Sequence, residues 1–159
     1  MSAISGYFVN SNNCLVVNAV FSVIKNPGGI YNPIIICGSY GTGKTHLLHA
    51  VENYIQATST KSIIYTTSED FLSEFIQSIE LKKVMDFKKK FCFTDVLLFD
   101  DIHFLQNKPA TQEELLLTSN SLISNKKQVV FTCDRPLDEL EKFSRKLSLL
   151  LNQGLQIDI

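Results

Sequence analysis

Residues 34–51 read IIICGSYGTGKTHLLHAV, and this stretch decides how the rest of the chain is interpreted. Three isoleucines, Ile34 to Ile36, form a short apolar run of the kind found in buried strands. The segment from Gly38 to Thr45 then fits G-x-x-x-x-G-K-[ST], and apolar residues at helical spacing follow at once. Strand, glycine-rich loop and helix in this order are the context that a phosphate-binding loop requires. The alternative, an ordinary glycine turn before a helix, explains the complete pattern less well.

The residue types in this loop suit a nucleotide phosphate and its metal ion. Gly41 and Gly43 allow successive backbone N–H groups to face one centre, and the following helix adds the partial positive charge of its N-terminus. Lys44 can reach the terminal phosphates, and the Thr45 hydroxyl can hold Mg²⁺. We therefore expect a nucleotide-binding site made by Gly38, Ser39, Tyr40, Gly41, Thr42, Gly43, Lys44, Thr45 and His46.

Length and composition indicate a single globular domain, which we expect to span residues 1–159. Hydrophobic residues make up 45% of the 159 residues and charged residues 19%, an ordinary balance for a packed core. The net charge of −1 gives no global attraction to nucleic acid or membrane. The four cysteines are widely spaced, which argues against zinc and redox motifs. With no signal segment and no integral membrane span, we expect a soluble cytoplasmic protein.

Outward from the loop, helical patterns and apolar runs alternate along the chain. Besides the helix after the loop, helices are expected from a cap at Asn13 to about Ile24 and over 68–79, 82–91, 111–124 and 137–151. Thr111, with Glu114 three residues later, has the pattern of a capping box. Strands are expected over 62–66, 95–99, 128–133 and 154–159. This alternation predicts an α/β fold with a parallel sheet and helices on both faces.

Acidic residues follow two of these strands. VLLFDD, residues 96–101, delivers Asp100 and Asp101 to the carboxyl end of a buried strand, where open parallel sheets bind ligands. Asp100 is placed to hold Mg²⁺, and Asp101 to orient or polarise an attacking water. Asp134 follows the strand 128–133 and could sense the terminal phosphate, with Arg135 anchoring it. The alternatives are an exposed acid pair in a loop and a turn acid beside a solvated arginine.

Two groups of basic residues do not by themselves indicate a site. Five lysines interleave with Phe87 and Phe91, which favours an amphipathic helix with a wet lysine face over a nucleic-acid contact; they are Lys82, Lys83, Lys88, Lys89 and Lys90. The histidines are not spaced as metal ligands. Those on the helix after the loop, His46 and His49, suit packing or phosphate-side contacts better.

With these motifs in place, the sequence resembles the AAA+ ATPase domain of the bacterial DnaA replication initiators. The resemblance covers nearly the whole chain and rests on the phrases NPGGIYNP, GKTHLLHAV, YTTSEDFLSEFI, DVLLFDDIHFLQNKPATQEEL, VVFTCDRP and GLQIDI. It implies a P-loop NTPase of the AAA+ type: a three-layer αβα sandwich with a five-stranded parallel sheet in the order 5-1-4-3-2. It also implies ATP or ADP with Mg²⁺ as ligands.

The resemblance further implies partners. They are origin DNA, other initiator subunits through self-assembly, and acidic lipids by association. In relatives, a helical insert, here about residues 68–92, and the loop after the Walker B acids line a channel for single-stranded DNA. This implies DNA contacts at Ile76, Lys82, Lys83 and Lys108. Asn13 falls where relatives contact adenine.

Three departures from the family pattern keep other functions open. The arginine that relatives extend into a neighbour's ATP falls on Leu150, so hydrolysis is expected to be weak. The loop arginine that helps relatives hold single-stranded DNA falls on Ala110. The sequence stops at Ile159 without the family's lid and helix-turn-helix, as expected for an excised fragment or a shortened relative. One alternative is therefore a degenerate initiator relative that binds nucleotide or a partner without hydrolysis. Others are a helicase loader or initiator regulator and, last, a small-molecule P-loop kinase.

Overall fold

A five-stranded parallel sheet forms the centre of the protein in the computed structural model, which describes residues 14–159. The strands lie in the order β2-β3-β4-β1-β5, which confirms the predicted order read from the opposite edge. The elements are α1 (Cys14–Lys25), β1 (Ile34–Cys37), α2 (Lys44–Thr58), β2 (Ile63–Thr67), α3 (Ser68–Glu80), α4 (Val84–Cys92), β3 (Val96–Asp100), the 3-10 helix η1 (Ile102–Leu105), α5 (Pro109–Ser124), β4 (Gln128–Cys133), the 3-10 helix η2 (Leu137–Glu139), α6 (Arg145–Gln153) and β5 (Leu155–Asp158).

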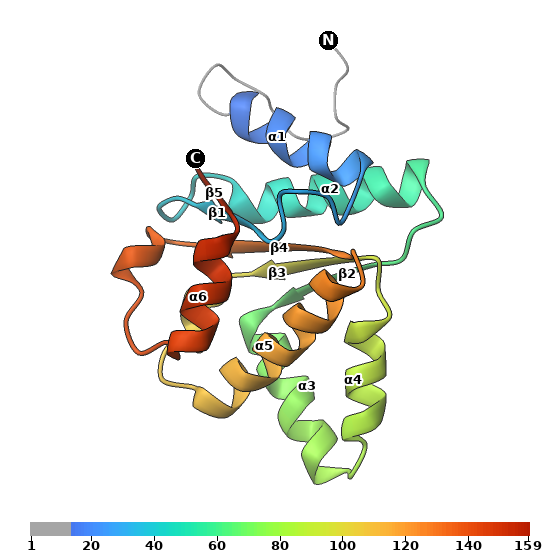
Figure 1. The fold of residues 1–159 in the computed structure, drawn as a ribbon, viewed down its shortest axis with the longest axis vertical. Coiled ribbons are helices and arrows are strands. Elements are labelled where there is room, and N and C mark those ends of the chain that lie inside the picture. Colours follow the sequence, from blue (N-terminus) through green and yellow to red (C-terminus); the bar gives the residue numbers. More distant parts are fainter. Residues whose placement is uncertain (1–13) are drawn as a thin grey trace.

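Helices cover both faces of the sheet and make a three-layer sandwich (Figure 1). Helices α1 and α2 pack on one face against alternate residues of the central strands, such as Ile34, Ile36 and Leu98. The other face, with Ile35 and Phe99, is covered by α3, α4, α5 and α6. Because successive side chains of a strand point to opposite faces, each central strand supplies both cores.

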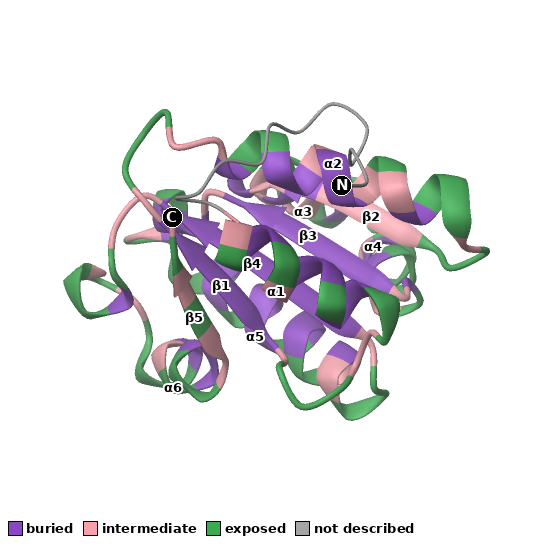
Figure 2. Ribbon diagram, turned by 90° about the horizontal axis from the view of Figure 1, so that it is seen from above, coloured by how far each residue is buried: buried purple, intermediate pink, exposed green. Residues whose placement is uncertain are grey.

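Burial explains why the central strands read as continuous apolar runs. Every residue of β1, β3 and β4 is buried, whereas β5 at the edge alternates between half-buried and exposed positions (Figure 2). A parallel strand covered on both faces carries a near-continuous apolar run, and its few buried polar side chains need hydrogen-bond partners. The strands β3 and β4 therefore end at Asp100 and Cys133, where the chain emerges at the carboxyl edge of the sheet.

Helices α3 and α4 span the residues expected to form the helical insert, and they pack their aromatic side chains inward. Phe71 lies with its ring centroid 5.2 Å from Phe87 and 5.0 Å from Phe91, and all three are buried. Lysines of α4 instead pair with acidic side chains: Lys88 with the buried Glu114 at 3.1 Å, and Lys90 with the more exposed Glu74 at 2.7 Å. This arrangement agrees with the amphipathic interpretation of the lysine-rich stretch.

The predicted cap of α5 is wrong. The helix begins at Pro109 with Lys108 as its N-cap, so Thr111 lies buried inside the first turn. Proline suits the first helical position because its fixed φ and missing N–H cost nothing there. No side chain caps this N-terminus, since the N-cap residue Lys108 makes no capping hydrogen bond.

The predicted helix over 137–151 is also wrong, because a non-helical segment interrupts it. Only η2 and α6 are helical, and Ser144 caps α6 by accepting a hydrogen bond from the Leu147 N–H at 3.2 Å. The buried amide of Gln112 holds the segment between them: it donates to the Lys142 carbonyl at 2.9 Å and accepts from the Ser144 N–H at 2.8 Å. The 3-10 helix η1 was not expected either. No helix in the described part of the chain has the length and hydrophobicity needed to cross a membrane.

Candidate nucleotide-binding site

The glycine-rich loop between β1 and α2 adopts the backbone that an anion-binding nest needs. Gly41 and Gly43 have φ values of 81° and 90°, in the left-handed region that residues with side chains rarely adopt. Gly43 is the N-cap of α2, which begins at Lys44. The first turn of a 15-residue helix therefore opens directly onto the loop, with its free N–H groups facing the same side.

The start of the loop is packed tightly against the end of the sheet. The Ile159 N–H donates to the Cys37 carbonyl at 2.9 Å, which extends the β1–β5 ladder to the loop. A Cβ atom added to Gly38 would lie 2.8 Å from the Ile159 carbonyl oxygen and 2.7 Å from its Cγ2. Such contacts are too short for any side chain, so this position needs glycine.

Lys44 lies across the inner side of the loop. Its side chain is buried, and the ammonium Nζ donates to the carbonyl oxygens of Gly38 at 2.6 Å and Ser39 at 2.9 Å. Nothing anionic among the described residues pairs with this ammonium. A buried ammonium held only by two neutral carbonyls would gain from an anionic ligand, because a buried charge is stabilised when an opposite charge pairs with it.

Asp100, at the end of β3, is held by three hydroxyl groups. Its Oδ2 accepts hydrogen bonds from Thr45 at 2.7 Å and from Tyr65 at 2.8 Å, and its Oδ1 accepts one from Thr132. The carboxylate is 1% exposed. The structure thus brings together Thr45 and Asp100, the two residues expected to hold Mg²⁺, although they are 55 positions apart. A hydroxyl and a carboxylate oxygen are the hard ligands that Mg²⁺ prefers, so the residues present fit this ion.

Asp101 has an unusual backbone for a residue with a side chain. Its φ of 59° and ψ of 52° are left-handed. Two contacts fix this conformation: the Asp101 N–H donates to the Thr132 hydroxyl at 2.8 Å, and the Ser68 hydroxyl donates to the Asp101 carbonyl at 2.7 Å. Burial, and then the charge of Asp100, raises the pKa of the Asp101 carboxyl above its ordinary value.

A cavity of about 490 Å³ opens above the loop. It is lined by Tyr40, Gly41, Gly43, Lys44, Thr45, His46, His49 and Asp101, so most of the expected loop residues and one expected acid share one hollow. Tyr40 is fully exposed at its rim. The volume of the cavity lies in the range of small-molecule sites in proteins, about 300–1,000 Å³.

Asp134 is positioned by its neighbours at the end of β4, and it does not line this cavity. Arg135 donates to both of its carboxylate oxygens, at 2.7 and 2.9 Å, and these bonds are the main cause of its lowered pKa. His103 accepts the Asp134 N–H at 3.2 Å, and burial lowers the pKa of this imidazole. Ligand atoms of His103, Cys133 and Asp134 lie within 4.8 Å of one another, a grouping that sequence spacing did not reveal. Because Arg135 and the backbone already engage the carboxylate and one ring nitrogen, these contacts account for the grouping without an ion.

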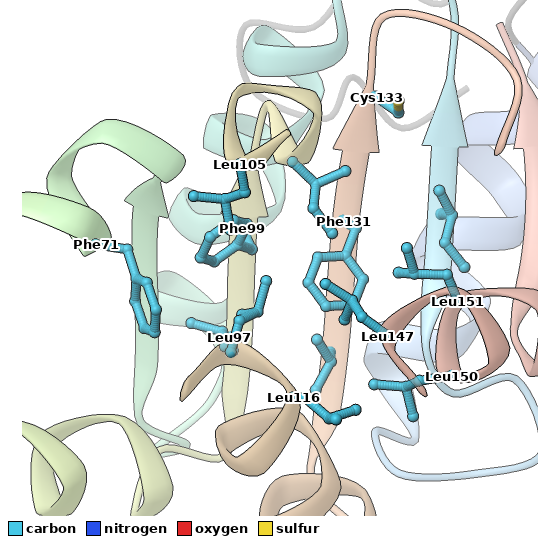
Figure 3. Packing of buried hydrophobic residues seen from close by; sticks show 14 of the residues in the cluster. Phe71, Leu97, Phe99, Leu105, Leu116, Phe131, Cys133, Leu147, Leu150 and Leu151 are labelled. Atoms are coloured by element: carbon cyan, nitrogen blue, oxygen red, sulfur yellow. The ribbon is translucent and has the colours of Figure 1, made fainter. Parts of the chain in front are cut away.

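The remaining predicted residues lie away from the cavity, and Asn13 lies outside the described residues. Ile76 is 47% exposed on α3, Lys82 and Lys83 are exposed in the turn between α3 and α4, and Lys108 is exposed before α5. Leu150, at the expected arginine position, is buried at 7% among the side chains of one hydrophobic core, beside Leu147 (Figure 3).

Sequence reasoning missed three contributors to the site: Tyr65, Thr132 and the ring of His49 against Tyr65. Tyr65 and Thr132 lie on the sheet face that also carries Asp100. Tyr65 pairs in register with Leu98, which precedes Asp100 by two residues, and Leu98 pairs with Val130, which precedes Thr132 by two residues. The signal was available in the sequence as hydroxyl residues near the ends of adjacent strands. It becomes useful once the strand order is known.

A phosphate-type loop after the first strand, an acid at the end of β3, and a 5-1-4-3-2 parallel sheet define the nucleotide-binding core of a AAA+ P-loop ATPase.

Comparison with known proteins assigns the family within that class. The model of the bacterial DnaA ATPase domain matches residues 3–158, and the chain belongs to this family. It is 50% identical over 143 residues to the chromosomal replication initiator protein DnaA of Treponema pallidum, which covers 89% of this chain and 31% of that protein. The chain thus spans about a third of the curated relatives it matches. This assignment decides against the helicase-loader and kinase families.

Solved structures agree. A replication initiator DnaA bound to AMPPCP and single-stranded DNA superposes with a TM-score of 0.94 at 32% identity, covering 98% of this chain and 49% of that one. Domain III of the Thermotoga maritima replication initiation protein DnaA gives 0.92 at 35% identity, covering 98% and 65%. The observed sheet and helices therefore match the DnaA ATPase fold.

Proposed function

We propose that this chain is the ATP-binding switch domain of a DnaA-type replication initiator. In this proposal the domain acts in the cytoplasm, where bound nucleotide controls assembly with other initiator subunits on origin DNA and opening of the duplex. The observation that carries the proposal is the Thr45–Asp100 hydrogen bond at 2.7 Å, because it joins the acid strand to the loop whose cavity Lys44 and Thr45 both line. The solved structure of a related DnaA is bound to AMPPCP, an ATP analogue, which supports ATP or ADP as the ligand.

Each residue has a role that its chemistry supports. The loop amides and Lys44 bind the phosphates, and Thr45 with Asp100 holds Mg²⁺, which neutralises phosphate charge when it is bound. Asp101 faces the cavity and orients a water molecule. Asp134, kept ionised by Arg135, senses the terminal phosphate from the strand next to the loop.

DNA contact is proposed for the surface of the insert. The related structure that holds single-stranded DNA supports this partner class. Ile76, Lys82 and Lys83 are exposed at the outer end of α3 and α4, and Lys108 lies before α5. Lysines at these positions can neutralise phosphates, whereas Ile76 can contact a base or sugar.

Loss of the loop ammonium tests the nucleotide assignment. Lys44→Ala should abolish ATP binding measured by isothermal titration calorimetry in Mg²⁺, because no other cation lines the loop side of the cavity among the described residues, apart from the histidines. Lys61→Ala is the matched control, since Lys61 is exposed at the far end of α2 and should leave binding unchanged. Unchanged ATP affinity in Lys44→Ala would remove the assignment of the loop.

A second candidate function is a nucleotide-binding module of the same family that does not hydrolyse ATP. Leu150 favours it, because its side chain packs in the core instead of presenting charge to a neighbour. ATP turnover at several protein concentrations discriminates between the two. A specific rate that rises with concentration supports catalytic sites shared between subunits, whereas no turnover at any concentration supports the module.

A further inference from the structure

Tyr65 donates a hydrogen bond to Asp100, the acid of the candidate metal site, from a strand on which no site residue was predicted. It lies on the edge strand β2, and its hydroxyl donates to Oδ2 of Asp100 at 2.8 Å. This is the same carboxylate oxygen that accepts the Thr45 hydroxyl at 2.7 Å. The two donors come from different elements, Tyr65 from β2 and Thr45 from α2, and together they fix the position of that oxygen.

A second contact fixes the ring of Tyr65. Its centroid lies 4.2 Å from that of His49, with the rings tilted by 39°. His49 lies on the helix that begins in the phosphate loop and lines the cavity, and its Nδ1 lies 3.2 Å from a carboxylate oxygen of Glu52. The ring of Tyr65 is therefore held against the loop helix at one side and against the acid strand at its hydroxyl.

The Asp100 carboxylate is stabilised by neutral hydroxyl groups. Among the described residues, no lysine or arginine hydrogen-bonds to this carboxylate, and its donors are the hydroxyls of Thr45, Tyr65 and Thr132. Burial first, and then the hydrogen bond to Asp100 and nearby negative charge, raises the pKa of the Tyr65 phenol far above its ordinary value.

We propose that Tyr65 is a positioning residue for the metal ion of the bound nucleotide: its hydroxyl, with its ring fixed on His49, holds Oδ2 of Asp100 in register with the Thr45 hydroxyl. This inference rests on the proposed function, because it requires Mg²⁺–ATP as the ligand. Tyr65 touches neither phosphate nor metal in this role and acts through Asp100. Groups that orient metal ligands in this way typically change metal affinity by 10- to 100-fold.

The test compares ATP binding in Mg²⁺ with ATP binding in EDTA for the 159-residue chain. The readout is the dissociation constant in EDTA divided by the dissociation constant in Mg²⁺, both measured by calorimetry. In Tyr65→Phe this ratio should fall by about tenfold relative to the unsubstituted chain, the lower end of the range for such orienting groups. The dissociation constant in EDTA should stay within about twofold, because the loop and Lys44 are untouched. Tyr54→Phe is the matched control: its ring packs edge-on against Phe21 in the layer of α1 and α2, and it should keep the full ratio.

The possible results separate this inference from the proposed function. If the unsubstituted chain binds no ATP in Mg²⁺, the proposed function and this inference fail together. If it binds ATP but Tyr65→Phe keeps the ratio, or loses affinity equally in Mg²⁺ and EDTA, the positioning role alone is overturned. Tyr65→Met, which also lacks the hydroxyl, gives a second measurement should the phenylalanine variant unfold, and the same fall in ratio is required of it.

Discussion

Replacing Thr132 with valine removes one hydroxyl that serves two residues of the site. The Thr132 hydroxyl accepts the Asp101 N–H at 2.8 Å and donates to Asp100, and the residue is fully buried. Valine has nearly the same shape and suits a strand equally well. The substitution therefore isolates the polar contribution, leaving a backbone N–H and a buried carboxylate each short of one partner.

The structure sets the size of the effect. A hydrogen bond to a charged group contributes about 1.5–3 kcal/mol, and a buried donor without a partner costs about 1–3 kcal/mol. Because the two terms share one hydroxyl, we expect Thr132→Val to lower the free energy of unfolding by about 2–4 kcal/mol. With a urea m-value of about 2 kcal/mol/M, the unfolding midpoint should fall by about 1–2 M.

The assay is urea unfolding followed by circular dichroism without nucleotide, and α5 offers a matched control. The hydroxyl of Thr118 is buried and has no hydrogen-bond partner among residues 14–159, so Thr118→Val should leave the midpoint unchanged or raise it. The two threonine-to-valine changes are thus expected to differ in sign or to differ widely in size. A Thr132→Val midpoint within about 0.3 M of the unsubstituted chain, or a fall that Thr118→Val reproduces, would refute the reasoning.

Two further predictions concern titrating groups. The Lys127 ammonium, and then the Ser62 N–H, lowers the pKa of Asp95 from 3.8 to about 2, so the stability it adds is present above about pH 4 and is lost as the pH falls toward 2. Asp95→Asn should therefore cost about 1–2 kcal/mol at pH 6 and almost nothing at pH 2, and a cost that does not vary with pH in urea unfolding would contradict the assignment. Burial raises the pKa of the Cys37 thiol to about 12 and that of Cys133 above its ordinary value. In a reaction with a disulfide reagent at pH 8, these two thiols should be modified only after unfolding, whereas the half-buried thiols of Cys14 and Cys92 should react in the folded chain. Equal reaction rates for all four thiols would contradict this prediction.

The elements that local chemistry determines were predictable from the sequence. Residues 128–133 form a strand with the predicted bounds, because a strand buried on both faces carries a mostly apolar run, here Val129 to Phe131. The phosphate loop was readable because glycines at Gly41 and Gly43 are required by backbone geometry at fixed spacing. The sheet order came from the resemblance to the family and was confirmed by the structure.

The errors arose where a distant side chain decides the local backbone. Residues 137–151 have a helical pattern, but the amide of Gln112 binds the backbone at Lys142 and Ser144 in a segment that is not helical. Similarly, the hydroxyls that surround Asp100 come from β2, β4 and α2, which are neighbours only in the folded sheet. A single sequence contains those residues but does not state which strands are adjacent.

The contact between Ile159 and Gly38 makes the edge strand and the loop one mechanical unit. A shift of β5 relative to the loop would disturb two contacts: the close approach of Ile159 to Gly38, where only glycine leaves room, and the hydrogen bond from the Ile159 N–H to the Cys37 carbonyl. A displacement of this strand would therefore act directly on the residue at which the loop begins.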